Sequence, residues 1–270
     1  MRDELRKIVN NGWFDLHIHT TASDGSYSPK EVVQRAKQNG LMCIAITDHD
    51  TLDGIAEAIE EGGKLGVVII PGIELSTKYQ GKSIDILGYG MTNHSELKSL
   101  LIQYCDGRLR RAQLIIDKFT ELGMPLTMED VMQFSRGSII ARPHIAKAVV
   151  QKGYVADTQT VFDQFLGNGR PCDVEKVHQS TQEAISLIHR YGGCAVLAHP
   201  ILIQDNDLVN EIVDAYPFDG IEVWHSKQKG SSVQLYKEIA ERFGLLMTGG
   251  SDFHNDQQSI GDFGLSWHDK

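Results

Sequence analysis

The fold is decided by the stretch WFDLHIHTTASDGSYSPKEVVQRAKQNGLMCIAITDHDTLDGIAEAIEEGGKLGVVIIP, residues 13–71. Short runs rich in apolar residues predict strands, at 13–20, 41–47 and 67–71. Two longer amphipathic runs predict helices, at 28–39 and 53–64. The first helix has a clear start, because Ser28 is suited to cap it, Pro29 to fill its first position and Glu31 to complete a capping box. Strands that alternate with helices predict βαβ units and a parallel sheet.

The same alternation is interrupted once further along the chain. After a strand predicted at 84–89, only helices are predicted, at 96–122, 127–135, 142–152 and 158–166. The alternation then resumes, with helices at 181–191, 208–215 and 231–243 and strands at 195–197, 220–224 and 245–249. We therefore expect an α/β barrel built from residues 1–95 and 179–270, interrupted by a helical insertion at 96–178.

The composition narrows the class of protein. Of the 270 residues, 41% are hydrophobic and 23% are charged, which is typical of a soluble globular protein. No apolar run is long enough to span a membrane, and the first residues lack the apolar core of a signal peptide. The four cysteines are far apart in the sequence and form no CxxC pair, so we expect reduced thiols and a cytoplasmic location.

The net charge of −10 argues against one class of partner. A surface that binds long duplex nucleic acid needs a broad excess of basic residues, which this chain lacks. The segment 100–178 is close to neutral, with ten basic and nine acidic residues. We therefore expect no long duplex partner and no membrane partner, and any nucleic-acid substrate should be short.

Candidate metal ligands occur where the predicted strands end. His17 and His19 are two residues apart on one strand, so their side chains share a face. Other candidates follow later strands: His49, Glu74, His199, Asp252 and His254. In barrels of alternating strands and helices the carboxyl ends of the strands meet at one end, where active sites form. A single histidine in such a place is more often structural, but the whole set predicts a metal-dependent hydrolase.

The chain resembles the PHP (polymerase and histidinol phosphatase) family, and the matching motifs extend in order over nearly its whole length. The motifs are Asp15-Leu16-His17-Ile18-His19-Thr20, Ser23-Asp24-Gly25, Ile46-Thr47-Asp48-His49-Asp50, Pro71-Gly72-Ile73-Glu74, Ala198-His199-Pro200 and Gly250-Ser251-Asp252-Phe253-His254. The resemblance implies a distorted (β/α)7 barrel that holds two or three divalent ions, Mn²⁺, Fe²⁺ or Zn²⁺. The subgroup it most resembles is the stand-alone bacterial phosphoesterases with a helical insertion, which include nucleoside 3′,5′-bisphosphate phosphatases and 5′-to-3′ exoribonucleases of short RNA.

The resemblance also implies three sets of metal ligands. The first metal would take His17, His19, Glu74 and Asp252; the second would share Glu74 and use His199; the third would take Asp24, His49 and His254. Many relatives have a further histidine for the second metal, where this chain has Asp85 in Asp85-Ile86-Leu87-Gly88-Tyr89. Asp85 is suited to bind a metal as an oxygen donor, and it could equally leave the second site weak.

The expected reaction is phosphate-ester hydrolysis of small nucleotides such as 3′,5′-bisphosphates, or of short oligonucleotides such as RNA. A metal-activated hydroxide would attack the phosphorus in line. Asp24 and His225 are the predicted catalytic residues, and Arg142, His144 and His225 are predicted to bind the substrate. Taken alone, Arg142 would be interpreted as a surface ion-pair residue, and it is the resemblance that favours a substrate role.

Two other interpretations remain open from the sequence. The chain could be a histidinol-phosphatase-like enzyme or another metal-dependent hydrolase, because one barrel site serves several chemistries. It could also be a metal- or nucleotide-binding module without activity. The near-complete ligand set argues against the second interpretation, because a module without activity has no physical need for so many ligands.

Overall fold

The protein is described here from a computed structural model, which describes residues 1–92, 94–135, 139–174, 179–228 and 230–265. The first half of the barrel follows the predicted alternation of strands and helices. Its elements are β1 (Phe14–Asp15), α2 (Pro29–Gln38), β2 (Cys43–Ile46), α3 (Ile55–Leu65) and β3 (Val68–Tyr79). The strands β1, β2 and β3 pair in parallel, as predicted, with Phe14 opposite Cys43 and Cys43 opposite Val68. A short helix, α1 (Arg2–Asn11), precedes them and buries Leu5.

The predicted start of α2 is confirmed. The Ser28 hydroxyl accepts a hydrogen bond from the Glu31 N–H at 3.2 Å, and the Glu31 carboxylate accepts one from the Ser28 N–H at 2.8 Å. This reciprocal pair satisfies two N–H groups that the helix itself leaves without partners. The position at which α2 begins is thereby defined by local hydrogen bonds.

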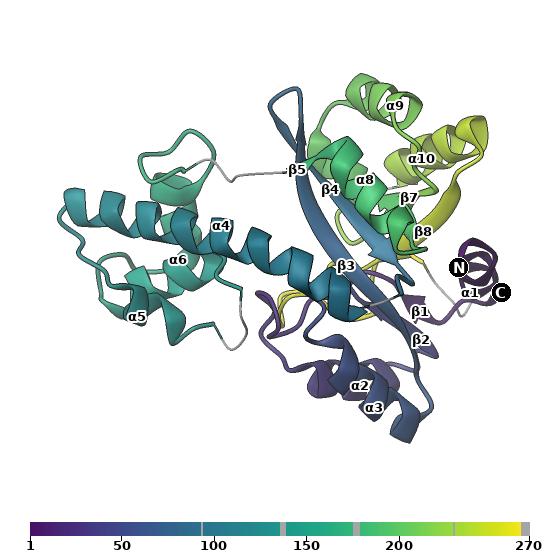
Figure 1. Ribbon diagram of the computed structural model, residues 1–270, viewed down its shortest axis with the longest axis horizontal. Coiled ribbons are helices and arrows are strands. Elements are labelled where there is room, and N and C mark those ends of the chain that lie inside the picture. Colours follow the sequence, from purple (N-terminus) through teal and green to yellow (C-terminus); the bar gives the residue numbers. More distant parts are fainter. Residues whose placement is uncertain (93, 136–138, 175–178, 229, 266–270) are drawn as a thin grey trace.

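Seven strands form a nearly closed barrel in the order β1-β2-β3-β4-β6-β7-β8 within the described residues (Figure 1). The later strands are β4 (Lys82–Tyr89), β6 (Cys194–Leu197), β7 (Gly220–His225) and β8 (Leu246–Gly250). The barrel closes because the end of β8 returns to the first strand, where Leu16 N–H donates to Gly249 O at 3.1 Å. The helices α8 (Thr181–Arg190), α9 (Asn206–Ala215), α10 (Gly230–Phe243) and the short helix η2 (Pro200–Ile203) connect these strands.

Two strands differ from the prediction made from the sequence. The first is short: only Phe14–Asp15 pair with β2, because the backbone from Leu16 onward bonds mainly to the end of β8. The strand β3 is longer than 67–71 and contains Glu74, because it continues into a hairpin with β4 that turns at Gly81. The strand β4 therefore runs antiparallel to both of its neighbours, β3 and β6. A two-residue strand, β5 (Gln179–Ser180), adds to β3.

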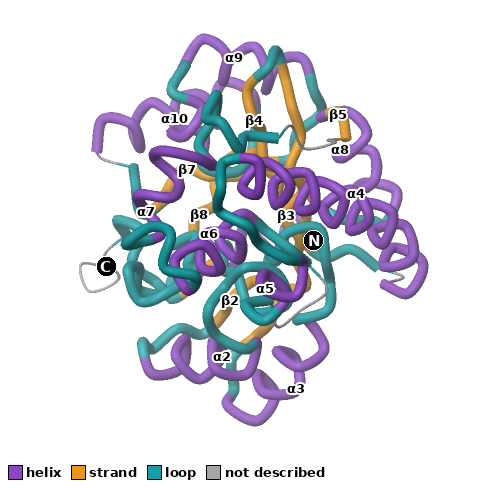
Figure 2. The backbone as a smooth tube through the Cα atoms, turned by 90° about the vertical axis from the view of Figure 1, so that its left-hand side faces the viewer, coloured by secondary structure: helices purple, strands orange, loops and turns teal. Residues whose placement is uncertain are grey.

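The helical segment between β4 and β5 has its own apolar core. It consists of α4 (His94–Glu121), α5 (Met128–Met132), α6 (Arg142–Gln151), α7 (Thr158–Val161) and a π-helix, η1 (Phe162–Leu166). The buried side chains that pack together inside it include Ile115, Phe119, Val131, Ile145, Val149 and Val161. The helix α4 extends from the barrel into this segment, and Figure 2 shows α5 and α6 in front of the barrel strands. The C-terminal boundary predicted for the insertion falls at 175–178, which lies outside the described residues.

A further hydrophobic cluster fills the barrel itself. Phe14, Leu16 and Leu87 are fully buried there, and Leu5 of α1 packs into the same cluster and covers one end. No described helix is both long and apolar enough to cross a membrane. The polar centre lies at the other end of the barrel, at the carboxyl ends of the parallel strands.

We predict that Ser28→Ala lowers the free energy of unfolding by about 1 kcal/mol, because the N–H of Glu31 loses its acceptor. Urea unfolding followed by circular dichroism measures this change. The matched control is Ser28→Asp, which keeps an acceptor at the cap and should retain most of the stability. Equal losses in the two variants would contradict the capping role.

Candidate functional site

The residues at the carboxyl ends of the strands converge on one buried centre. His17 and His19 lie just past β1, His49 lies just past β2, and Glu74 lies within β3. Parallel bridges place Glu74 beside His49 and Ile18 beside Phe253. His199 follows β6, and Asp252 and His254 follow β8. The structure thus brings together the residues that the sequence motifs singled out.

Glu74 is at the middle of this centre and is only 1% exposed. Its Oε2 lies 3.0 Å from His49 Nδ1 and 3.2 Å from His19 Nε2. His17 Nε2 lies 3.6 Å from the same oxygen, and His199 Nε2 lies 3.0 Å from Oε1. Four imidazoles therefore surround one carboxylate in a buried position, where an uncompensated charge is costly.

Three groups of side chains are close enough to hold metal ions. In each group the ligand atoms lie within 4.8 Å of one another: His19, Asp24, His49 and His254; His17, Glu74 and His199; and His17, His19 and Asp252. Imidazole and carboxylate together are the donor set that suits Mn²⁺, Fe²⁺ or Zn²⁺. Adjacent groups share His17 and His19, so bound ions would be neighbours.

Several atoms of these groups are buried without a hydrogen bond. They are Nε2 of His17, both ring nitrogens of His19, Nδ1 of His49 and Oε2 of Glu74. A buried polar atom that makes no hydrogen bond costs free energy, and nearly all such atoms in proteins have a partner. Here the atoms point at one another, so a divalent cation between them would satisfy them together. The donor set and these atoms both fit a metal centre.

The charges of the centre shift the pKa values of its groups in opposite directions. Burial lowers the pKa of His19, but the nearby carboxylates of Asp252 and Glu74 outweigh it and raise that pKa to about 10. Burial raises the pKa of Glu74, but the surrounding histidines, His49 and His17 first, hold it well below the ordinary value. Burial lowers the pKa of His49 to about 4, because its neighbouring carboxylates compensate only in part. The carboxylate of Glu74 is thus held in its charged form, in which it can stabilise a nearby cation.

The backbone is strained at three positions of this centre. Asp50, His199 and Asp252 have φ values of +53°, +24° and +54°, in the region that favours glycine. Such strain persists only where the surroundings enforce it, and it occurs often at functional sites. Gly250 explains part of the enforcement, because a Cβ there would lie 2.4 Å from the Cβ of His17. The turn after β8 therefore packs directly against the first strand.

Three buried carboxylates, none of which was predicted to have a role, support the centre. Glu222, on β7, lies 3.2 Å from His17 Nδ1 and accepts the His199 N–H at 2.7 Å. Asp15 accepts from the N–H and the hydroxyl of Ser251. A third, Asp48, holds the loop that carries Asp24 by accepting from Thr20 and Ser23. Asp15 and Asp48 stand inside the quoted motifs, whereas Glu222 could be suspected only as an acid inside an apolar strand.

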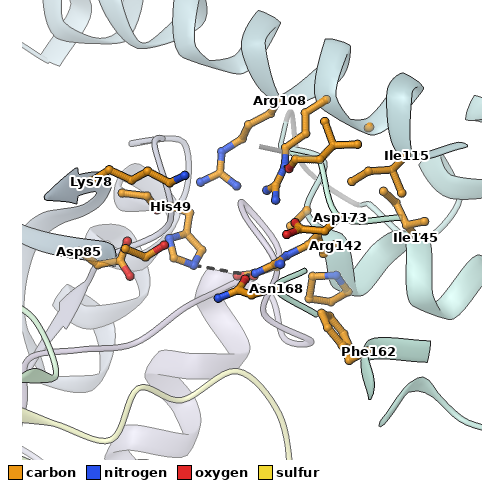
Figure 3. Close-up of a pocket in the computed structure, with 18 of the residues that line it drawn as sticks. His49, Lys78, Asp85, Arg108, Ile115, Arg142, Ile145, Phe162, Asn168 and Asp173 are labelled. Carbon is orange, nitrogen blue, oxygen red and sulfur yellow. Dashed lines mark hydrogen bonds and ion pairs between the residues drawn. The ribbon is translucent and has the colours of Figure 1, made fainter. Parts of the chain in front are cut away.

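A cavity of about 850 Å³ opens beside the centre, between the barrel and the helical segment (Figure 3). Asp24, His49 and Asp85 line its barrel side, and Asp85 Oδ2 lies 3.9 Å from His199 Nε2. Basic side chains line much of the remainder: Lys78, Lys82, Arg108, Arg111 and Arg142. Figure 3 shows Lys78, Arg108 and Arg142 pointing toward the space beside His49. A cavity that combines cationic side chains from both walls with metal-ligand types suits an anion such as a phosphate ester.

A buried ion pair connects the two sides of this cavity. Arg108, on α4, donates from Nε to Asp50 Oδ2 at 2.6 Å, and both side chains are almost fully buried. Asp50 directly follows His49, so α4 is fixed to the loop that carries a candidate ligand. This pair could not be predicted from the sequence, because its partners are 58 residues apart.

The three predicted substrate residues lie in different places. Arg142 lines the large cavity and donates to Leu166 O at 3.0 Å. His225 is fully buried inside the centre, with Nε2 3.4 Å from Asp252 Oδ2. His144 lines a smaller neighbouring pocket; burial lowers its pKa to about 4, and its Nδ1 accepts the Ala141 N–H. Only Arg142 of the three thus faces the large cavity.

Comparisons with known proteins agree with this geometry. Residues 15–192 match the PHP domain family. The chain is 35% identical to a 5′-3′ exoribonuclease of Haemophilus influenzae, over 89% of each chain. It is 30% identical to a 3′,5′-nucleoside bisphosphate phosphatase of Chromobacterium violaceum, over 93% of this chain and 90% of the relative. A solved Bifidobacterium adolescentis structure, whose name assigns it to the metal-dependent phosphoesterases, superposes with a TM-score of 0.83 at 30% identity, over 93% of this chain and 91% of that one.

We predict that Glu222→Gln weakens Mn²⁺ binding by about 10- to 100-fold, because a carboxylate behind a ligating histidine orients the ring and increases its basicity. Titration of metal-stripped protein with Mn²⁺, followed by calorimetry, measures the change. The matched control is Glu61→Gln, which changes another buried glutamate that lies on α3, outside the metal groups. Unchanged Mn²⁺ affinity in Glu222→Gln would rule out the supporting role.

Proposed function

We propose, since this chain belongs to the PHP domain family, that it is a metal-dependent phosphoesterase acting on small nucleotides such as 3′,5′-bisphosphates, or on short oligonucleotides. The observation that carries the proposal is the joint placement of three metal-ligand groups and a cation-lined cavity. The names of the relatives support the same class of reaction, since one is an exoribonuclease and another a bisphosphate phosphatase.

We propose two or three divalent ions, Mn²⁺, Fe²⁺ or Zn²⁺, as the cofactor. His17, His19, Glu74 and Asp252 would hold the first; Glu74 and His199, with Asp85, the second; Asp24, His49 and His254 the third. The geometric groups support this division in outline, although His19 also lies within reach of the third set. When bound, such ions lower the pKa of a coordinated water and neutralise phosphate oxygens.

The protein's own groups divide the remaining work. The positions of Arg108, Arg142 and Lys78 support binding of the phosphate groups, because their charges face the cavity beside His49. Hydrolysis joins the oxygen of a water molecule to phosphorus and breaks the ester P–O bond, and the departing oxygen must gain a proton. Asp24 and His225 remain our proposed catalytic residues for this proton transfer, since both lie in the centre.

The helical segment, residues 96–178, is proposed as the substrate-binding cap on a barrel of residues 1–95 and 179–270. Its separate apolar core supports this division. Its contribution to the cavity wall, which includes Arg108, Arg142 and Phe162, supports the substrate role. His144 is proposed to contact substrate as a hydrogen-bond donor, because burial keeps its pKa at about 4 and its ring neutral.

We predict that the protein releases phosphate from adenosine 3′,5′-bisphosphate when Mn²⁺ is added, and that a chelator abolishes the release. A phosphate assay with and without the chelator tests this expectation. The variant Asp252→Ala removes a central ligand candidate and should be inactive, whereas the exposed Glu238→Ala should behave like the wild type. If neither the bisphosphate nor a short RNA is hydrolysed with Mn²⁺ bound, the proposed function is wrong.

We further predict that Arg142→Ala raises KM for the bisphosphate at least tenfold more than KM for an aryl phosphate, because only the bisphosphate has a second phosphate for the guanidinium to bind. Steady-state kinetics on both substrates measures the two values. The control is Arg170→Ala, which changes an exposed arginine of the same segment that does not line the cavity. Equal effects on both substrates would remove Arg142 from second-phosphate binding.

A further inference from the structure

Two cavities meet at the loop that carries Asp24. The large cavity is lined by Asp24 itself. A second pocket of about 180 Å³ is lined by Ser23 and Gly25, the residues on either side of Asp24. Gly25 is required there, because a Cβ would lie 2.6 Å from the His19 carbonyl oxygen. The metal-ligand loop therefore separates two spaces.

The helix α6 is shared between the same two spaces. Arg142, Pro143 and Ile145 line the large cavity. His144 and Lys147, three residues apart and so on one face of the helix, line the smaller pocket. His144 lies near enough to Asp24 and Lys147 for both charges to act on its pKa, although burial has the largest effect. One helix thus presents a cationic side chain to each space.

The lining of the smaller pocket suits a sugar-phosphate unit. Lys147 is half-buried, and no side chain or backbone group in the part of the chain that the structure describes pairs with its ammonium. The hydroxyl-bearing residues Thr21 and Ser26 and the partly buried ring of Phe134 complete much of the wall. Pockets that enclose a whole ligand usually measure about 300–1,000 Å³, so this one is too small for a complete nucleotide.

The reaction itself calls for space on both sides of the reacting phosphorus. In an in-line displacement the attacking and leaving oxygens lie on opposite sides of the phosphorus. A mononucleotide held at the metal centre can be accommodated by the large cavity alone. A phosphodiester within an oligonucleotide has a nucleotide chain on each side of the cleaved bond. The chain that remains after cleavage therefore needs a binding space of its own, beside the one that holds the removed end.

We propose that the smaller pocket binds the sugar-phosphate unit that follows the cleaved bond in a short single-stranded oligonucleotide, with Lys147 contacting its phosphate. This inference rests on the proposed phosphoesterase function and extends it. The large cavity takes the end that is removed, and the pocket beside α6 takes the remaining chain. The pocket thereby distinguishes oligonucleotide substrates from mononucleotides.

The test measures binding separately from hydrolysis, with Lys147→Gln. We expect its Kd for a 5′-phosphorylated phosphorothioate trinucleotide, which resists hydrolysis, to rise about tenfold, as for loss of one charged contact. The slope of log Kd against log salt should fall by about 0.7, the value for one phosphate of a single strand. The ratio of kcat/KM for trinucleotide RNA to that for adenosine 3′,5′-bisphosphate should fall by a similar factor.

Two further variants control the test. Lys152→Gln changes another lysine at the end of α6, whose ammonium pairs with Asp130 at 2.8 Å away from the pocket, and it should leave Kd and the ratio unchanged. Lys147→Arg keeps the charge and should restore most of the affinity. Equal trinucleotide Kd values for wild type and Lys147→Gln would overturn the proposal. Failure of the wild type to hydrolyse either substrate would instead overturn the proposed function.

Discussion

The structure depends on the burial of a carboxylate, Glu74, among four histidines. Burying the carboxylate or any one of the rings alone would cost free energy, because a buried charge needs a partner. Each group is therefore stable in this position only because the others surround it. The arrangement needs four segments of the chain to meet at the same point. The barrel supplies that point, because the strands carry their carboxyl ends to one rim. The buried polar centre can therefore form only in a topology that brings these strand ends together.

The supporting groups show how the requirement is met. Glu222 holds both His17 and the backbone of His199, so a residue in the middle of β7 orients ligands that follow β1 and β6. Asp15 and Asp48 do the same for the turn after β8 and the loop before α2. Each of these carboxylates accepts several hydrogen bonds, which makes its burial tolerable. The hydrogen bonds of these carboxylates help to offset the strain of the positive φ angles at His199 and Asp252.

Much of the fold could be predicted from the sequence, because the apolar runs and helix starts are local signals. The capping box at Ser28 and the parallel β1–β2–β3 pairing are examples. The direction of β4 could not be predicted, since it depends on a hairpin turn at Gly81 rather than on periodicity. Most of the candidate ligands were visible because they follow an apolar run, whereas Asp24 was implied by the family resemblance. Glu222, the Arg108–Asp50 pair and the two-sided exposure of α6 were not visible, because they depend on contacts between segments distant in the sequence.

The placement of the cavity walls has a consequence for how such a protein diverges. The candidate metal ligands belong to the barrel, whereas Arg108, Arg142, Phe162 and Lys147 belong to the segment with its own core. Substitutions in that segment can accumulate without disturbing the ligand geometry, apart from those at the Arg108–Asp50 connection. Under the proposed function, substitutions in this segment would change substrate preference without changing the metal ligands. If the helical segment binds substrate as proposed, a duplicated gene could acquire a new phosphorylated substrate through substitutions in that segment alone.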